Sequence, residues 1–184
     1  MHRKEQELYT AGLSFAPKDS LIHLYRCICA ASQHDTVHLA QYMDEFFSAL
    51  TRVQPWEAYQ ERLKGLICDK ADLPEKTVEH YRKATELDPG NDYYKYFYAA
   101  RLIDYETEAD KGMEIIEELK IKYPEAEDGW ADLWLKEGKY MMLKGDYEGA
   151  LIKFKAAKEA WLTYLYDIDE LIREAEEGLA RSSS

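Results

Sequence analysis

Four of the five prolines divide the chain at nearly equal intervals. Pro17, Pro55, Pro89 and Pro124 are separated by 38, 34 and 35 residues. Proline cannot continue a helix and also restricts the residue that precedes it, so each proline marks the end of a helix and the start of a new segment. A recurring interval of this length indicates a chain built from helical repeats.

The segment from Trp134 to Ala157 shows most clearly what one repeat contains. It reads as two short helices joined by a tight turn at residues 144–146. Gly138 and Ala150 let the two helices approach closely, because neither carries a large side chain. Phe154 and Ala157 follow Ala150 at spacings of four and three, which keeps all three residues on one helical face.

This segment resembles one tetratricopeptide (TPR) repeat. The residues at five of the family's signature positions are Trp134, Gly138, Ala150, Phe154 and Ala157. Two positions depart from the pattern, since Glu137 replaces the usual leucine and Met141 the usual tyrosine. The equivalent positions 38 residues earlier are Ala100, Gly112, Ile116 and Leu119. A further 35 residues back they are Gly65, Thr77, Tyr81 and Ala84.

The resemblance implies an all-α fold, a TPR-like right-handed superhelix of antiparallel helix pairs, in a single domain over residues 1–184. We expect TPR-like repeats at 58–91, 93–126 and 131–164, a looser repeat at 19–56, and a half repeat or cap at 3–18. Residues 165–180 carry one apolar and one acidic face, as expected of a C-terminal capping helix that covers the last repeat. The low glycine and proline content also favours helices.

The net charge of −12 bears on the choice of partner. Affinity for nucleic acid and for anionic membranes depends on cationic contacts, so we expect neither as a partner. The sequence contains no run of eighteen apolar residues, and its first twelve residues lack the apolar stretch of a secretory signal. We therefore expect a cytoplasmic protein.

The sequence shows no catalytic constellation. It lacks a glycine-rich phosphate loop, a nucleophile elbow and a CxxC pair, so we expect no enzyme and no cofactor. His34 and His38 are four residues apart, but no glutamate follows in the metalloprotease arrangement and His34 falls in an expected turn. We therefore expect no metal site. Cys27, Cys29 and Cys68 are predicted to be buried free thiols, because an odd number forms no disulfide framework.

The TPR resemblance further implies that the first helix of each repeat lines a concave groove. By position, the groove residues are Tyr59, Arg62, Leu66, Tyr94, Phe97, Tyr98, Arg101, Tyr105, Lys136 and Lys139, with Asp69 and Leu143 beside them. The set is aromatic and basic, and tyrosine and arginine suit binding hot spots. We therefore expect a scaffold or adaptor that binds a protein or peptide partner with acidic and apolar residues.

Some TPR proteins hold a C-terminal carboxylate with lysine, asparagine and arginine at set groove positions. Arg62 and Lys136 match two of the cationic positions. Leu66, Tyr98 and Asp132 stand where the family has asparagine or lysine. A clamp of this kind is therefore not expected.

Two alternatives stay open. Some groove aromatics can instead belong to the core, because the aromatic residues of one helix cannot all face one way. These residues are Tyr93, Tyr94, Tyr96, Phe97 and Tyr98. The chain can also be a self-associating structural protein, a homodimer formed through its N-terminal helices. An exposed apolar patch at Phe46 and Phe47 would favour the homodimer.

Overall fold

The structure is a computed structural model of the 184-residue chain. It describes residues 9, 11–14, 20–50, 55–123, 131–159 and 168–182. In these ranges the regular secondary structure is entirely α-helical. The chain divides into two compact units, an N-terminal unit, Met1–Tyr94, and a C-terminal unit, Lys95–Ser184.

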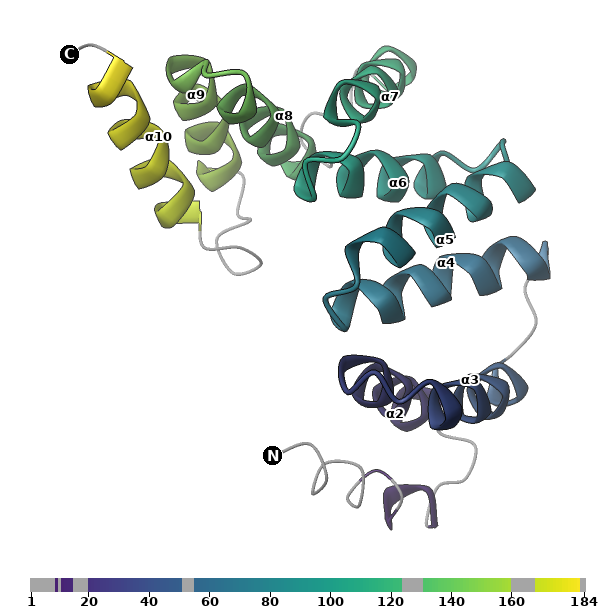
Figure 1. The fold of residues 1–184 in the computed structure, drawn as a ribbon. Coiled ribbons are helices and arrows are strands. Elements are labelled where there is room, and N and C mark those ends of the chain that lie inside the picture. The colour runs from purple at the N-terminus through teal and green to yellow at the C-terminus, as the bar shows by residue number, and fades with distance from the viewer. Residues whose placement is uncertain are drawn as a thin grey trace. The chain divides into compact units, whose positions relative to one another are not determined.

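Four helices make up most of the described N-terminal unit: α2 (Ser20–Ser32), α3 (Thr36–Ala49), α4 (Trp56–Lys70) and α5 (Pro74–Leu87). Helix α2 packs on α3 and on α4, and α4 packs on α5 (Figure 1). Asp35 caps α3 by accepting a hydrogen bond from the backbone N–H of His38. Pro74 begins α5, where its missing N–H would have had no partner within the helix.

The core of the N-terminal unit joins α2, α3 and α4. Its buried members are Cys27, Ala31, Phe46, Leu63, Ile67 and Ala71. Helix α5 approaches α4 where Gly65 faces Tyr81, and a Cβ atom at Gly65 would lie 3.0 Å from the buried tyrosine ring. The small residue at this repeat position therefore makes room for a large one on the partner helix.

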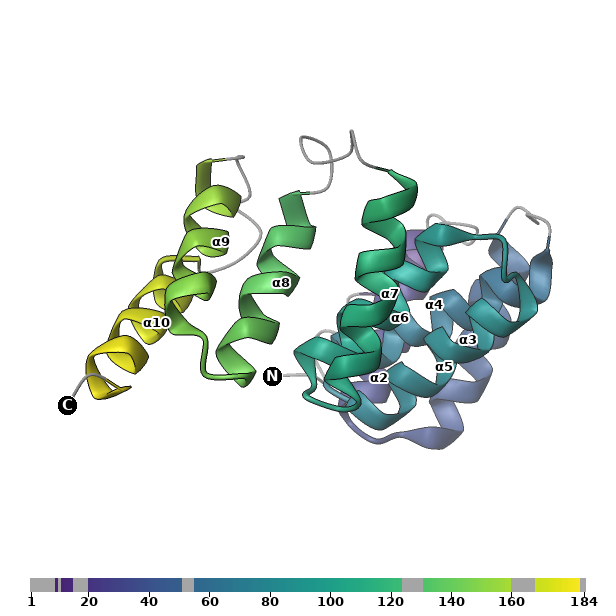
Figure 2. The ribbon, with the colours of Figure 1, turned by 90° about the horizontal axis from the view of Figure 1, so that it is seen from above.

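Helix α6 (Asp92–Asp104) crosses from one unit into the other. The C-terminal unit continues with α7 (Ala109–Lys122), α8 (Ala131–Leu143), α9 (Tyr147–Glu159) and α10 (Ile168–Ser182). Helices α8, α9 and α10 lie side by side in chain order (Figure 2). In the turn before α9, Gly145 has a φ of 76°, and Asp146 accepts a hydrogen bond from the backbone of Gly149 at 2.9 Å.

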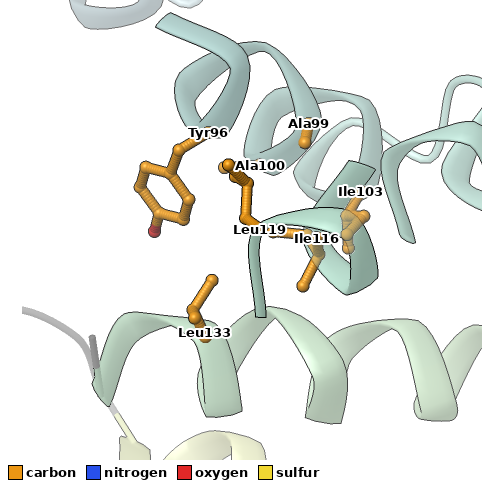
Figure 3. Packing of buried hydrophobic residues seen from close by; sticks show 7 residues of the cluster. All are labelled: Tyr96, Ala99, Ala100, Ile103, Ile116, Leu119 and Leu133. Atoms are coloured by element: carbon orange, nitrogen blue, oxygen red, sulfur yellow. The ribbon is translucent and has the colours of Figure 1, made fainter. Parts of the chain in front are cut away.

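Two clusters form the core of the C-terminal unit. The first joins α6 to α7 and α8, and Figure 3 shows its members: Tyr96, Ala99, Ala100, Ile103, Ile116, Leu119 and Leu133. The second joins α8, α9 and α10 around Phe154, which is fully buried. A Cβ atom at Gly138 would lie 2.4 Å from the Phe154 ring, so the glycine is needed for the close packing of α8 on α9.

Several predicted features lie outside the described residues. They are Pro17, Pro124 and the ends of the repeats predicted at 93–126 and 131–164, together with most of the predicted half repeat at 3–18. The division into repeats remains a prediction, although α10 occupies the place of the expected capping helix. None of the helices in the described ranges combines the length and hydrophobicity that crossing a bilayer requires.

Candidate functional site

The predicted groove residues of the N-terminal unit lie on α4 and at the start of α6. They are Tyr59, Arg62, Leu66 and Tyr94. The first three are half-buried, whereas Tyr94 is buried against Ala58 and Ala84. The guanidinium carbon of Arg62 lies 5.7 Å from the centroid of the Tyr93 ring, a cation–π contact. The α4 face therefore presents a cation beside aromatic surface.

The predicted groove residues of the C-terminal unit lie on α6, the turn after it and α8. They are Phe97, Tyr98, Arg101, Tyr105, Lys136 and Lys139. Tyr98 is buried, and its hydroxyl oxygen accepts a hydrogen bond from Lys111 Nζ at 2.9 Å. Phe97, Arg101 and Tyr105 are half-buried. Burial of Tyr94 and Tyr98 agrees with the alternative that some of these aromatics belong to the core.

The three cations of this set converge on Asp104, the last residue of α6. Lys136 Nζ donates hydrogen bonds to both carboxylate oxygens, at 2.8 and 2.7 Å. Lys139 Nζ donates to Oδ1 at 2.9 Å, and Arg101 Nη1 donates to Oδ2 at 2.5 Å. Sequence reasoning missed Asp104, because a single carboxylate at a helix end forms no motif. The three-residue spacing of Lys136 and Lys139, which places both on one helical face, was the available signal.

Burial and charge act in opposite directions on this cluster. Burial alone would raise the pKa of Asp104, but attraction to Lys136 and Lys139 outweighs it and lowers the pKa from 3.8 to about 2. Burial lowers the pKa of Lys136, against the opposing influence of Asp104 and Asp132. Only 1% of Lys136 is exposed. This differs from its predicted place as an open groove cation, and its ammonium group acts as a structural counter-ion.

An open cleft of about 420 Å³ lies beside the Asp104 cluster, with all its walls in the C-terminal unit. Its apolar lining comes from Ile103, Met142, Leu143, Tyr147 and Leu171. Its charged lining comes from Asp104, Glu106, Lys139, Glu174, Glu177 and Arg181. We refer to this site as the C-terminal cleft. Two of its lining residues, Lys139 and Leu143, were predicted from the sequence as groove residues or their neighbours. The lining residues from α10 were not predicted.

Helix α10 forms one wall of the C-terminal cleft because it packs closely on α9. A Cβ atom at Gly178 would lie 2.3 Å from the Tyr147 ring, so glycine permits this approach. Leu171, Glu174 and Glu177 follow one another at spacings of three and therefore share a side of α10. Together with Arg181, the helix thus places one apolar, two acidic and one basic side chain at the cleft.

The charges that line the C-terminal cleft are unequally compensated. Lys139 is paired with Asp104, and Arg181 lies 3.9 Å from Glu177. Glu106 and Glu174 are both exposed, and neither forms an ion pair with another residue in the described ranges. The cleft therefore offers two carboxylates whose charge the described part of the chain leaves uncompensated.

The described residues offer little for metal or nucleophilic chemistry. They contain no group of three or more histidine, cysteine, aspartate or glutamate side chains that could hold a metal ion. His38 Nδ1 lies 2.7 Å from Asp35, while His34 stands in a turn with a φ of 55°. Cys27, Cys29 and Cys68 are buried free thiols, as predicted.

The apolar patch that would favour a homodimer is not formed by the two phenylalanines named for it. Phe46 is buried in the core of the N-terminal unit. Phe47 is half-buried, and its ring packs edge-on against Trp56 with centroids 6.3 Å apart. Both side chains are therefore engaged within the chain.

Comparison with known proteins defines the class of fold. The chain has an all-α, TPR-like fold of helices packed in antiparallel pairs, as predicted from its repeats. One similar solved structure is that of YrrB, described as a TPR protein with an unusual peptide-binding site. The match has a TM-score of 0.53 and covers 96% of this chain and 84% of that one, at 14% sequence identity. No family model and no curated protein matches the sequence.

Proposed function

We propose that the chain is a non-catalytic scaffold that binds a protein or peptide along the first helices of its repeats. The observation that supports this most strongly is the TPR-like fold, matched over 96% of the chain to a protein described as having a peptide-binding site. A shared fold does not determine function, so the proposal also depends on the exposed chemistry of the first helices.

The proposed contact residues are the half-buried members of the predicted groove. They are Tyr59, Arg62, Leu66, Phe97, Arg101, Tyr105 and Lys139. Partly exposed aromatic and arginine side chains gain contact area and hydrogen bonds when a partner covers them. Tyr59, Arg62 and Leu66 belong to the N-terminal unit and the other four to the C-terminal unit. Tyr94, Tyr98 and Lys136 are buried and are not proposed as contacts.

The acidic, apolar partner expected from the sequence is proposed for the α4 face, where Arg62 lies beside aromatic surface. There, Arg62 lies over Tyr93 and its planar guanidinium group is suited to pairing with a carboxylate. Arg62 is therefore the residue whose removal tests the acidic ligand.

The test begins with capture of partners from native lysate by the full chain and their identification by mass spectrometry. The captured partner is then purified, and its affinity is measured by calorimetry against wild type, Arg62→Ala and Arg82→Ala. Arg82 is a matched control, because it lies exposed on α5 and pairs with Glu86. We expect Arg62→Ala to weaken binding about tenfold and Arg82→Ala to leave it unchanged.

Two results would count against the proposal. Equal affinity of the purified partner for all three proteins would exclude the α4 face as the binding surface. Failure of every captured protein to bind the purified chain would remove the scaffold function itself. Equal helicity of the three proteins by circular dichroism is the required control for folding.

A further inference from the structure

We infer that the C-terminal cleft binds a peptide segment that combines an apolar side chain with lysine or arginine. The inference rests on the proposed scaffold function and specifies the ligand chemistry at one site. The cleft has the volume for a few side chains, at about 420 Å³, and its walls belong to one compact unit. Its lining residues come from α6 and the turn after it, and from α8, α9 and α10, so we treat it as one binding site.

The apolar lining provides the driving force for binding. Leu143 is 40% exposed, and Met142 and Leu171 beside it are half-buried. Apolar surface that stays accessible within a concave site is removed from water when an apolar side chain enters. A ligand residue such as leucine or phenylalanine satisfies this part of the cleft.

The charged lining selects the sign of the ligand. An acidic ligand would meet Lys139 and Arg181, but both cations already lie beside carboxylates of the cleft. A cationic ligand would meet Glu106 and Glu174, which have no ion-pair partner in the described ranges. Complementary charge of this kind governs specificity and association rate.

The charge balance of helix α10 agrees with this preference. Its acidic residues are Asp169, Glu170, Glu174, Glu176 and Glu177, and its basic residues are Arg173 and Arg181. Of these, only Glu174, Glu177 and Arg181 line the cleft, and their net excess of one carboxylate favours a cationic segment. The preferred ligand at this site is thus opposite in charge to the one that the residue pattern of the groove predicts.

Fluorescent synthetic peptides test the charge preference directly. The probe is an amphipathic peptide of leucine and lysine residues, compared with one that carries glutamate for lysine and one that carries serine for leucine. Binding to the full chain is measured by fluorescence anisotropy at low and moderate salt. We expect the leucine–lysine peptide to bind about tenfold tighter than either comparison peptide, with affinity that falls as salt rises.

Matched substitutions locate the binding. We expect Glu106→Gln with Glu174→Gln to weaken the leucine–lysine peptide about fivefold, the effect of losing two solvent-exposed ion pairs. Glu176→Gln is the control, because Glu176 is exposed on α10 but does not line the cleft. Leu143→Ser should also weaken binding, whereas Ile152→Ser, at an exposed apolar position outside the cleft, should not.

The control at Glu176 decides the outcome, because general attraction to an acidic protein acts equally at Glu174 and Glu176. Equal effects of the cleft and control substitutions would overturn the inference, as would equal affinity for the glutamate peptide. If a captured partner still binds through Arg62, these results refute only the ligand inferred for the cleft. If no captured protein binds the purified chain, the scaffold function is refuted whatever the peptides show.

Discussion

Replacing Asp104 with asparagine tests whether the cations of the C-terminal unit are structural. Asparagine keeps the size of the side chain but removes the charge that Lys136, Lys139 and Arg101 share. Lys136 is 1% exposed and would be left buried without its carboxylate. Loss of one partner of a buried ion pair costs about 3–5 kcal/mol. We expect the free energy of unfolding at pH 7 to fall by about 3 kcal/mol.

The pH dependence gives an independent measure of the same interaction. The pKa of Asp104 is about 2 in the folded protein and 3.8 in the reference state, a difference that corresponds to about 2 kcal/mol. Because the folded pKa is the lower one, the unfolded chain takes up the proton first as the pH falls. The stabilisation is therefore present above about pH 4 and is lost between about pH 4 and about pH 2. The Asp104→Asn variant has no carboxylate at this position and should not show this loss of stability as the pH falls.

Urea unfolding followed by circular dichroism, at pH 7 and at steps toward pH 2, measures both effects. Asp169→Asn is the control, since Asp169 pairs with Lys158 at an exposed site and should change stability by less than about 0.5 kcal/mol. Combining Asp104→Leu with Lys136→Met replaces the buried pair by apolar groups and should recover most of the stability. A change below about 0.5 kcal/mol for Asp104→Asn at pH 7 would refute the structural role of the cluster.

Three further predictions concern packing and thiol chemistry. Gly138→Ala should destabilise the fold by about 1–2 kcal/mol in urea unfolding despite the better helix propensity of alanine, because its Cβ would lie 2.4 Å from the Phe154 ring. Gly112→Ala should lower the free energy of unfolding further, since its Cβ would lie 2.8 Å from a backbone oxygen. Gly90→Ala should be nearly neutral, because a Cβ there would meet open space. Equal destabilisation by the three substitutions would contradict this packing. Cys27 is fully buried and its pKa is raised to about 12, so it should react with a thiol reagent only in unfolding urea, and rapid labelling of the native chain would contradict its burial.

The helix pairs were predictable because close packing leaves a mark in the sequence. Where two backbones approach, one helix needs a small residue and its partner supplies a large one, as Gly65 does with Tyr81 and Gly138 with Phe154. These residues recur at a nearly constant interval, so the pattern is visible without knowledge of the tertiary contacts. The same reasoning holds for caps and turns, which depend on neighbouring residues, as at Asp35.

The C-terminal cleft was not predictable in the same way. The apolar face of α10 indicates that one side of this helix is buried, and the sequence expectation of a capping helix follows from that alone. Which charged residues then flank the cleft depends on how α10 is rotated and on the close contact of Gly178 with Tyr147. Neither property has a local signature, so Glu174 was expected only as part of a solvated face.

The lysines at the predicted groove positions of the C-terminal unit show that residue type alone does not reveal which charges are already paired. Lys136 and Lys139 lie on the first helix of their predicted repeat, as expected, but each is paired with a carboxylate more than thirty residues away in the chain. An acidic ligand would have to compete with Asp104 for these cations, and the one most tightly held, Lys136, is out of its reach in the interior. A cationic ligand leaves the Asp104 cluster intact and pairs with Glu106 and Glu174, so it binds without breaking an existing ion pair. Charge compensation, rather than the number of lysines at groove positions, is therefore the property from which we infer the ligand of this cleft.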